Sequence, residues 1–269
     1  MNRLKDILTS ARAENRAVLI GYLPAGFPTV DGSIDAMRAM VEGGCDIIEV
    51  GLPYSDPAMD GPVIQAAADQ ALARGTGTPD VIRAAGAVAD TGAAALIMSY
   101  WNPIEHYDVE RFAAELAAAG GSGVITPDLI PEEAGPWIAA TDKHDLGRVF
   151  LVAPNSTPER IALTAAASSG FVYAGAVMGV TGARDQVGHA ARNLVERTRQ
   201  ATDQAVCVGL GVSTGDQAAE IATYADGVIV GSAFVRRLLD NRDPRAGADA
   251  VRELAAELAD GVRRGSKAR

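Results

Sequence analysis

A unit of three parts recurs along the chain: a helix that ends in glycine, a short aliphatic strand, and a loop with polar residues. It is visible where Gly43-Gly44 precedes Ile47-Ile48, where Gly120-Gly121 precedes Val124-Ile125, and where Asp226-Gly227 precedes the run from Val228 to Val230. Glycine commonly ends a helix, and a short run of Ile and Val is typical of a buried parallel strand. The repeat therefore predicts an α/β fold with a parallel sheet.

About eight such strands alternate with helices. Besides those three runs, they are expected at Ala17–Tyr22, Ala95–Tyr100, Val149–Ala153, Phe171–Ala174 and Ala205–Gly209. Eight is the strand count of a (β/α)8 TIM barrel. A doubly wound open sheet is the alternative, but no G-x-G-x-x-G follows the first strand and no break in composition divides the chain into halves.

Three helices depart from a plain alternation. Arg3–Glu14 precedes the first strand and is expected to plug the bottom of the barrel. Pro79–Asp90 adds a second helix after strand two, behind Val63–Arg74, and Ala246–Arg264 closes the chain as an amphipathic helix. Because no low-complexity linker interrupts the sequence, we expect residues 1–269 to form a single domain.

Charge and cysteine content exclude several classes of function. The formal net charge is −10, which disfavours nonspecific binding to nucleic acid or to an anionic membrane. Cys45 and Cys207 both lie in apolar runs and are expected to be buried thiols, neither a disulfide nor a metal pair. With no signal sequence and no apolar run long enough to span a bilayer, a cytoplasmic location is expected.

Two carboxylates stand out in the stretch from Cys45 to Gln65. Glu49 lies inside an apolar strand, where desolvation raises its pKa and suits it to proton transfer near neutral pH. Asp60 lies in the following loop, rich in Pro and Gly, and is expected to be partly solvated and ionised. The pair resembles the division of labour between a protonated and an ionised catalytic acid. The alternative for Glu49 is a buried structural acid held by a neighbouring donor.

Small residues after the last two strands predict an anion site. Gly209-Leu210-Gly211 precedes a helix opened by Ser213 and Thr214, and Gly231-Ser232 opens the helix after the final strand. Backbone N–H groups at helix starts bind phosphate without any lysine, and this end of a barrel is its usual phosphate site. Glycine in a strand-to-helix turn also serves purely steric needs, so each pair alone is weak evidence.

The run E-V-G-L-P-Y-S-D-P-A-M-D-G-P-V-I-Q from Glu49 to Gln65 closely resembles the signature of the tryptophan synthase alpha subunit family. Further matches at Tyr173, at Gly179-Val180-Thr181-Gly182, at Gly209-Leu210-Gly211 and at Gly231-Ser232 extend the resemblance over essentially the whole chain. The resemblance implies that Glu49 and Asp60 are the catalytic acids and that the hydroxyl of Tyr173 reaches the reacting substrate.

The resemblance also assigns the surrounding positions. It implies phosphate binding by Gly182, Gly211, Gly231 and Ser232 and an indole pocket lined by Tyr22, Met98, Ile125, Leu210 and Ile229. The loop from Gly175 to Gln186 would be a lid, in which Thr181 engages Asp60 on closure.

By the same resemblance, the substrate is indole-3-glycerol phosphate, cleaved by a retro-aldol step to indole and glyceraldehyde 3-phosphate. The chain itself would need no cofactor. Its partner would be a beta subunit in an alpha2-beta2 tetramer, which carries pyridoxal phosphate and makes L-tryptophan from indole and L-serine. The contact surface would include Pro53, Asp56, Pro57 and Asn102, in the segments Pro53–Pro57, Trp101-Asn102-Pro103 and Asp128–Pro131.

Two other functions remain open from the residues alone. A sugar-phosphate epimerase or isomerase would share the phosphate glycines, and a noncatalytic sensor of a phosphorylated metabolite would share the barrel. His106, His144 and His189 have no i, i+4 partner or clustered acid, so no metal site is expected. The presence of both Glu49 and Asp60 argues against the sensor.

Overall fold

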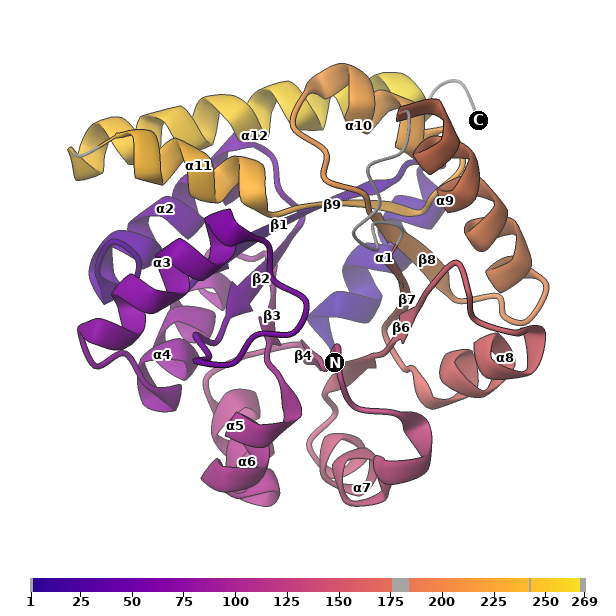
Figure 1. Cartoon of the computed structure of the whole chain (residues 1–269), viewed down its shortest axis with the longest axis horizontal. Coiled ribbons are helices and arrows are strands. Elements are labelled where there is room, and N and C mark those ends of the chain that lie inside the picture. The colour runs from indigo at the N-terminus through magenta and orange to yellow at the C-terminus, as the bar shows by residue number, and fades with distance from the viewer. Residues whose placement is uncertain (1, 176–183, 242, 267–269) are drawn as a thin grey trace.

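The computed structural model describes residues 2–175, 184–241 and 243–266, with the backbone alone for 184–187. Its strands form one parallel sheet in the order β5-β4-β3-β2-β1-β9-β8-β7-β6, curved into a ring (Figure 1). The strands are β1 (Val18–Pro24), β2 (Ile47–Gly51), β3 (Ala94–Met98), β4 (Gly123–Ile125), β5 (Gly147–Val149), β6 (Leu151–Val152), β7 (Phe171–Gly175), β8 (Ala205–Gly209) and β9 (Gly227–Val230).

The segments β5 and β6 are two halves of one barrel strand, interrupted at Phe150. The first half pairs with β4 and the second with β7. The Phe150 carbonyl accepts a hydrogen bond from the N–H of Tyr173 on β7, at 3.1 Å, so the connection continues across the interruption. The prediction of an eight-stranded (β/α)8 barrel is confirmed, since nine segments make eight strands.

All the helices except α1 lie around the ring, and α12 runs along its outside (Figure 1). They are α1 (Arg3–Ala13), α2 (Val30–Gly43), α3 (Pro62–Ala73), α4 (Thr78–Ala89), α5 (Trp101–Tyr107), α6 (Val109–Ala118), α7 (Gly135–Lys143), α8 (Pro158–Ala167), α9 (Arg184–Arg199), α10 (Gly215–Ala222), α11 (Ser232–Asp240) and α12 (Pro244–Ser266), with a 3-10 turn at Pro131–Glu133. The predicted extra helices α1 and α4 are present. The predicted contact segment Trp101-Asn102-Pro103 forms the first turn of α5, a helix that the sequence did not predict.

Alternate residues of each strand point inward and form one apolar cluster with α1. Its buried members are Leu4, Ala11, Val18, Ile20, Ile47, Ala94, Leu96, Ile125, Val149, Phe171, Cys207 and Ile229. Leu4 is fully buried, and its Cδ2 lies 2.8 Å and 2.6 Å from where a Cβ would stand on Gly147 and Gly170. Glycine at these two positions therefore makes room for the helix that plugs the barrel.

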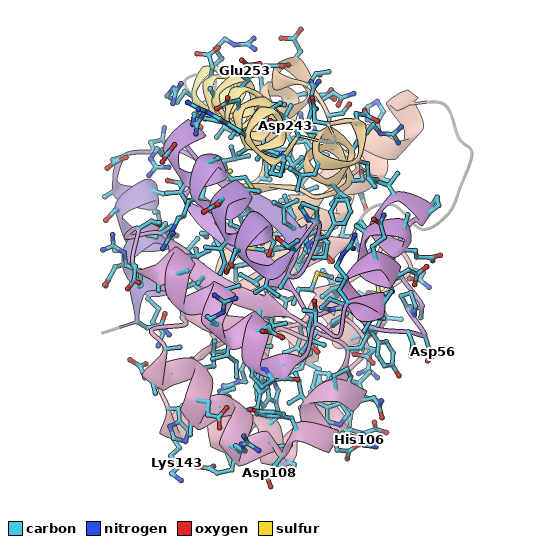
Figure 2. The ribbon with its side chains drawn as sticks, turned by 90° about the vertical axis from the view of Figure 1, so that its left-hand side faces the viewer. Asp56, His106, Asp108, Lys143, Asp243 and Glu253 are labelled. Carbon is cyan, nitrogen blue, oxygen red and sulfur yellow. The ribbon has the colours of Figure 1, made fainter. Side chains whose placement is uncertain are left out.

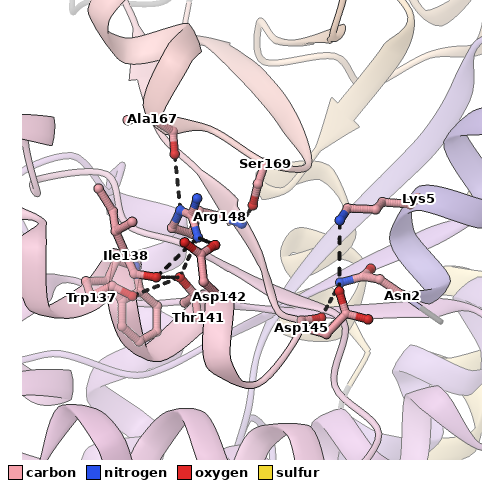
Figure 3. A network of polar contacts seen from close by, with 10 residues as sticks. All are labelled: Asn2, Lys5, Trp137, Ile138, Thr141, Asp142, Asp145, Arg148, Ala167 and Ser169. Carbon is pink, nitrogen blue, oxygen red and sulfur yellow. Dashed lines mark hydrogen bonds and ion pairs between the residues drawn. The ribbon is translucent and has the colours of Figure 1, made fainter.

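The start of α1 is anchored by Asn2. Its side chain accepts the N–H of Leu4 as the helix cap and donates to the carbonyl oxygen of Ser122 at 3.0 Å. It also donates to the carbonyl oxygen of Asp145 at 2.6 Å (Figure 3). A capping amide that also binds two other segments fixes the plug relative to the strands.

Arg148 on β5 lies at the centre of a second polar network (Figure 3). Its guanidinium donates to the Ala167 carbonyl at 3.1 Å, to Thr141 Oγ1 at 2.8 Å and to the Asp142 carboxylate. The Arg148 side chain is only 9% exposed. These bonds join the short strand β5 to α7 and to the end of α8, on the outside of the barrel.

Cys45 and Cys207 are free and buried, as predicted. Cys207 belongs to the barrel interior, and Cys45 lies in the layer between strands and helices. Across the described ranges, none of the helices combines the length and apolar character needed to cross a membrane.

Candidate active site

Glu49 points into the upper layer of the barrel interior. It lies on β2, beside Tyr22 of β1 and Leu96 of β3 in the sheet register, and is 1% exposed. Within the described residues its Oε1 has no hydrogen-bond partner. Burial raises the pKa of Glu49 from 4.5 to about 8, so the carboxyl is protonated at neutral pH. A buried acid without a structural partner fits proton transfer better than it fits support of the fold.

Asp60 lies in the irregular loop between β2 and α3. It is half-buried, which is more enclosed than the polar loop sequence suggested, and burial raises its pKa above the ordinary value. Gln65 of α3 donates from Nε2 to the Asp60 backbone carbonyl at 2.8 Å. The loop therefore holds Asp60 at the edge of the mouth, where a bound substrate would cover it further.

Two buried tyrosines lie near both acids at the C-terminal end of the barrel. After burial itself, the charges of Asp60 and Glu49 raise the pKa of Tyr22, and the charges of Glu49, Cys207 and Asp60 raise that of Tyr173. Tyr22 lies on β1 and Tyr173 on β7. The two phenols come from separated strands. The charges of both carboxyls can affect the pKa of both phenols only if the four side chains lie close together, as expected at the C-terminal end of a barrel.

Glycines on neighbouring strands provide the space for these rings. A Cβ on Gly51 would stand 2.4 Å from the Tyr22 hydroxyl oxygen, and a Cβ on Gly209 would stand 2.5 Å from that of Tyr173. A Cβ on Gly231 would approach the Tyr22 ring to 3.3 Å. The sequence drew attention to Gly209 and Gly231 for phosphate. Their second role, making room for tyrosines, was missed because it depends on side chains from adjacent strands.

The predicted indole-pocket residues fall into two groups. Met98, Ile125 and Ile229 pack in the barrel-interior cluster together with Tyr173. Leu210 instead packs against the cluster between strands and helices, the cluster to which Tyr22 also belongs. Ile125 is fully buried, whereas Met98 and Leu210 are partly exposed. The interior group therefore lies inside the barrel, where Met98 and Ile125 are level with Gly51, two residues beyond Glu49, and Leu210 lies beyond the end of β8.

The two helix starts predicted to bind an anion differ. At α10, Thr214 accepts the N–H of Gln217, and Glu257 accepts the N–H of Gly215 at 2.9 Å, so protein groups already satisfy this end. At α11 the structure gives no side-chain cap for Gly231 and Ser232 among the described residues. The start of α11 therefore leaves its backbone N–H groups without a side-chain acceptor among the described residues, as an anion site would require.

Gly211 is in the left-handed region, at φ +68°, and no described atom comes within 4 Å of where its Cβ would stand. It leaves open space beside the end of β8. Thr181 and Gly182, and most of the predicted lid from Gly175 to Gln186, lie outside the described residues.

The predicted partner surface is only partly exposed. Asp56 and Asn102 are exposed and Pro57 is half-buried, but Pro53 is buried within this chain. Asp56 and His106 project toward the same side of the molecule (Figure 2), as expected for segments that follow neighbouring strands. Ile130, within the predicted contact segment Asp128–Pro131, is 44% exposed, and Met59, which was not predicted to take part, is 47% exposed, so both add apolar surface here.

Sites elsewhere in the described structure are less suited to acid–base catalysis than the end of the barrel that carries Glu49 and Asp60. A cavity of about 610 Å³ lies at the opposite end of the barrel, between α1 and the start of β8, and Lys5, Arg12 and Gln204 are among its lining residues. None of the predicted site residues lines it. Over the described part of the chain, no cluster of His, Cys, Asp and Glu could hold a metal ion.

Comparison with known proteins was made on the full sequence and on the fold. Residues 8–263 match the family model described as tryptophan synthase alpha chain. The alpha chain of Thermobifida fusca is 64% identical, with 98% of each chain covered, and that of Mycobacteroides abscessus is 61% identical, with 97% of this chain and 98% of the relative covered.

Solved structures agree with the sequence relatives. Tryptophan synthase from M. tuberculosis in its aminoacrylate-bound form superposes with a TM-score of 0.89 at 52% identity, covering 98% of this chain and 100% of that one. A second structure of the M. tuberculosis enzyme gives 0.90 at 56% identity, covering 97% and 98%. With a converging pair of carboxyls at the barrel mouth and relatives that match over nearly their whole length, the chain belongs to the tryptophan synthase alpha chain family.

Proposed function

We propose that Glu49 and Asp60 carry out the alpha reaction, the cleavage of indole-3-glycerol phosphate to indole and glyceraldehyde 3-phosphate. One observation carries the assignment: Glu49 is buried beside Tyr22, its Oε1 has no hydrogen-bond partner among the described residues, and Asp60 lies in the loop that follows the same strand. Membership of the family selects this lyase activity over the isomerase and the sensor that the barrel alone would allow.

Glu49 is suited to move the protons. Protonated at neutral pH, it donates to C3 of the indole ring, and as a carboxylate it then accepts the proton of the side-chain hydroxyl while the carbon–carbon bond breaks. The electrons of that bond return to the indole ring, which leaves as neutral indole, and the hydroxyl-bearing carbon becomes the aldehyde. Glu49 ends the cycle protonated, as it began.

Asp60 is suited to the charge that develops on the indole nitrogen. Protonation of C3 leaves the ring electron-poor, and an ionised Asp60 accepting the indole N–H stabilises that positive charge. Its partial burial strengthens the interaction, because less water competes with it.

Binding at the far end of the substrate supplies the geometry. We assign the phosphate to the start of α11 at Gly231 and Ser232, with Gly211 beside it. The proposed roles of Gly182 in phosphate binding and of Thr181 in the lid rest on the family resemblance alone. Met98, Ile125 and Ile229 provide flat apolar contacts for indole, and Leu210 borders them from the end of β8. The Tyr173 hydroxyl lies within the electrostatic reach of both acids and is placed to contact the reacting side chain.

The partner is the beta subunit of tryptophan synthase, which holds the pyridoxal phosphate and condenses indole with L-serine. We propose that Asp56, Pro57 and Asn102 contact it, with the exposed side chains of Met59 and Ile130 supplying apolar area. Pro53 would stiffen the loop from within the chain. We also propose that residues 1–269 act as one domain and that the protein is cytoplasmic, in keeping with its two free thiols.

The Asp60→Asn variant tests the assignment. It keeps the size of the side chain and removes its charge, so we expect an unchanged circular dichroism spectrum and a loss of indole formation of about 100-fold or more. Asp69→Asn, on the exposed face of α3, is the matched control and should retain wild-type turnover. Turnover of the Asp60 variant at the wild-type rate would end this proposal.

A further inference from the structure

The loop that carries Asp60 has few bonds of its own. Between the end of β2 and the start of α3, residues 52–61 form no regular secondary structure, and most of their side chains are exposed or half-buried. Ser55 donates to the Asp56 carboxylate at 2.6 Å, and neither side chain bonds to any other of the described residues. Side chains from outside the loop must therefore hold Asp60 in place.

One of these side chains is Tyr100. It lies just beyond β3, at the N-cap of α5, and is 6% exposed. Its hydroxyl oxygen accepts a hydrogen bond from the backbone N–H of Met59 at 2.9 Å. Met59 immediately precedes Asp60, so this bond fixes the backbone one residue before Asp60.

Asp60 is thus held on both sides. Tyr100 binds the Met59 N–H before it, and Gln65 binds the Asp60 carbonyl after it. Gln65 belongs to α3, the helix that the loop itself enters, whereas Tyr100 comes from a different unit of the barrel. Tyr100 is therefore the contact that ties the loop to the strand framework at this point.

The Tyr100 ring is itself held in place. It stacks on Tyr54, with ring centres 5.3 Å apart and planes inclined by 33°. Behind it, the Trp101 N–H donates to both carboxylate oxygens of Asp128, at 2.9 Å and 3.2 Å, which fixes the start of α5. A phenol with a packed ring and an anchored backbone is a rigid acceptor, as positioning of a catalytic group requires.

We propose that Tyr100 is a positioning residue for Asp60, acting through the hydrogen bond from Met59 N–H to its hydroxyl. The inference rests on the proposed role of Asp60 in catalysis. Tyr100 itself transfers no proton in the reaction. It sets where the Asp60 carboxylate stands relative to the indole nitrogen, and a displacement of about 1 Å is enough to cost two orders of magnitude in rate.

The test is Tyr100→Phe, which keeps the ring and its stacking and removes only the acceptor. We expect kcat for cleavage of indole-3-glycerol phosphate, in the complex with the beta subunit, to fall by about 10- to 100-fold, with KM nearly unchanged. Tyr107→Phe is the matched control. Its hydroxyl bonds to Glu115 on the neighbouring helix, away from Asp60, and its activity should stay at the wild-type level.

A double-mutant cycle shows whether the effect passes through Asp60. Assayed at high enzyme concentration, Tyr100→Phe should lower kcat no further in an Asp60→Asn background, because the group it positions is already lost. Hydrogen exchange at the Met59 amide should be faster in Tyr100→Phe, with the amides of β2 and β3 unchanged. The exchange rate reports directly on the hydrogen bond from the Met59 N–H to the Tyr100 hydroxyl and does not depend on activity.

The inference is overturned if Tyr100→Phe is as active as Tyr107→Phe, if its loss adds in full to that of Asp60→Asn, or if exchange at the Met59 amide is unchanged. These outcomes are separate from failure of the proposed function. Wild-type turnover of Asp60→Asn alone would remove the catalytic role of Asp60, whatever Tyr100→Phe does.

Discussion

Tyr22 of β1 lies directly beside Glu49 of β2 in the parallel register, and both side chains are almost fully buried. The Tyr22 hydroxyl lies over Gly51, two residues beyond Glu49 on the same face of the strand. The Tyr22 phenol and the Glu49 carboxyl thus share the upper layer of the barrel interior. Packing of neighbouring side chains shields Glu49 from water. This environment sets the protonation state of Glu49.

Replacing Glu49 by Gln should make the stability of the protein less dependent on pH. The folded pKa of Glu49 is raised from 4.5 to about 8, so folding stabilises the protonated acid. The unfolded chain releases this proton above about pH 4.5, and the free energy of unfolding of the wild type therefore falls as the pH rises toward about 8. The contribution lost is on the order of a few kcal/mol.

Urea unfolding at several pH values measures the difference. The free energy of unfolding of Glu49→Gln minus that of the wild type should grow between pH 5 and pH 8 and then level off. Glu105→Gln, an exposed carboxyl on α5, is the control and should show no such trend. A constant difference over this range would show that Glu49 is ionised in the folded protein.

The same protonation state predicts the alkaline side of the pH profile of activity. If catalysis begins with Glu49 donating a proton, kcat/KM should fall as the pH rises through about 8, the pKa of the free enzyme. Activity should also fall at acid pH, as Asp60 becomes protonated. Steady-state indole formation across this range is the measurement, and a kcat/KM that stays flat well above pH 8 would contradict the assignment of Glu49 as the initial acid.

The sequence predicted the barrel because the signals for it are local. A glycine at a helix end and a short aliphatic run can each be recognised without knowing any neighbour, and their repetition gave the strand count. The interruption at Phe150 and the short helix from Trp101 to Tyr107 could not be recognised this way. The first depends on pairing with strands on both sides, and the second is too short to show a helical period.

The positions of Glu49 and Asp60 in the fold were predictable, whereas their surroundings were less so. Glu49 and Asp60 stand in one contiguous motif, but the burial of Asp60 depends on its tertiary surroundings. The Met59–Tyr100 hydrogen bond joins residues 41 positions apart and leaves no periodic trace in the sequence. Likewise, Gly51 looked like the end of a strand, although its lack of a side chain serves the ring of Tyr22.

Gly209→Ala should damage the site without unfolding the barrel. The added Cβ would lie 2.5 Å from the Tyr173 hydroxyl oxygen and 2.9 Å from the ring, so the ring must tilt away from its place near Glu49. We expect a loss of kcat/KM of about tenfold or more. Gly135→Ala is the control, because its added Cβ would meet no other described segment within 4 Å, and it should retain activity. Equal activity of the two variants would mean that the position of Tyr173 has no effect on turnover.

Replacing Arg148 should change the stability of the protein and not its activity. The Arg148 side chain lies on the face of β5 that points away from the site. Its buried guanidinium bonds to Ala167, Thr141 and Asp142 (Figure 3). Arg148→Met keeps much of the aliphatic stem and removes the donor to the Ala167 carbonyl and to the Thr141 hydroxyl, which still donates to the Trp137 carbonyl. The free energy of unfolding should fall by about 2 to 4 kcal/mol, as for a broken buried network.

Arg111→Met is the matched control for this loss. Arg111 makes an exposed i, i+4 ion pair with Glu115 on α6, at 2.8 Å, and water replaces that bond when it is removed. Its midpoint in urea should therefore equal that of the wild type, while the midpoint of Arg148→Met shifts down. Because Arg148 faces away from the barrel interior, the Arg148 variant should still cleave substrate at the wild-type rate below its unfolding transition. A loss of turnover in the fully folded variant would instead show that the geometry of β5 is transmitted to the site.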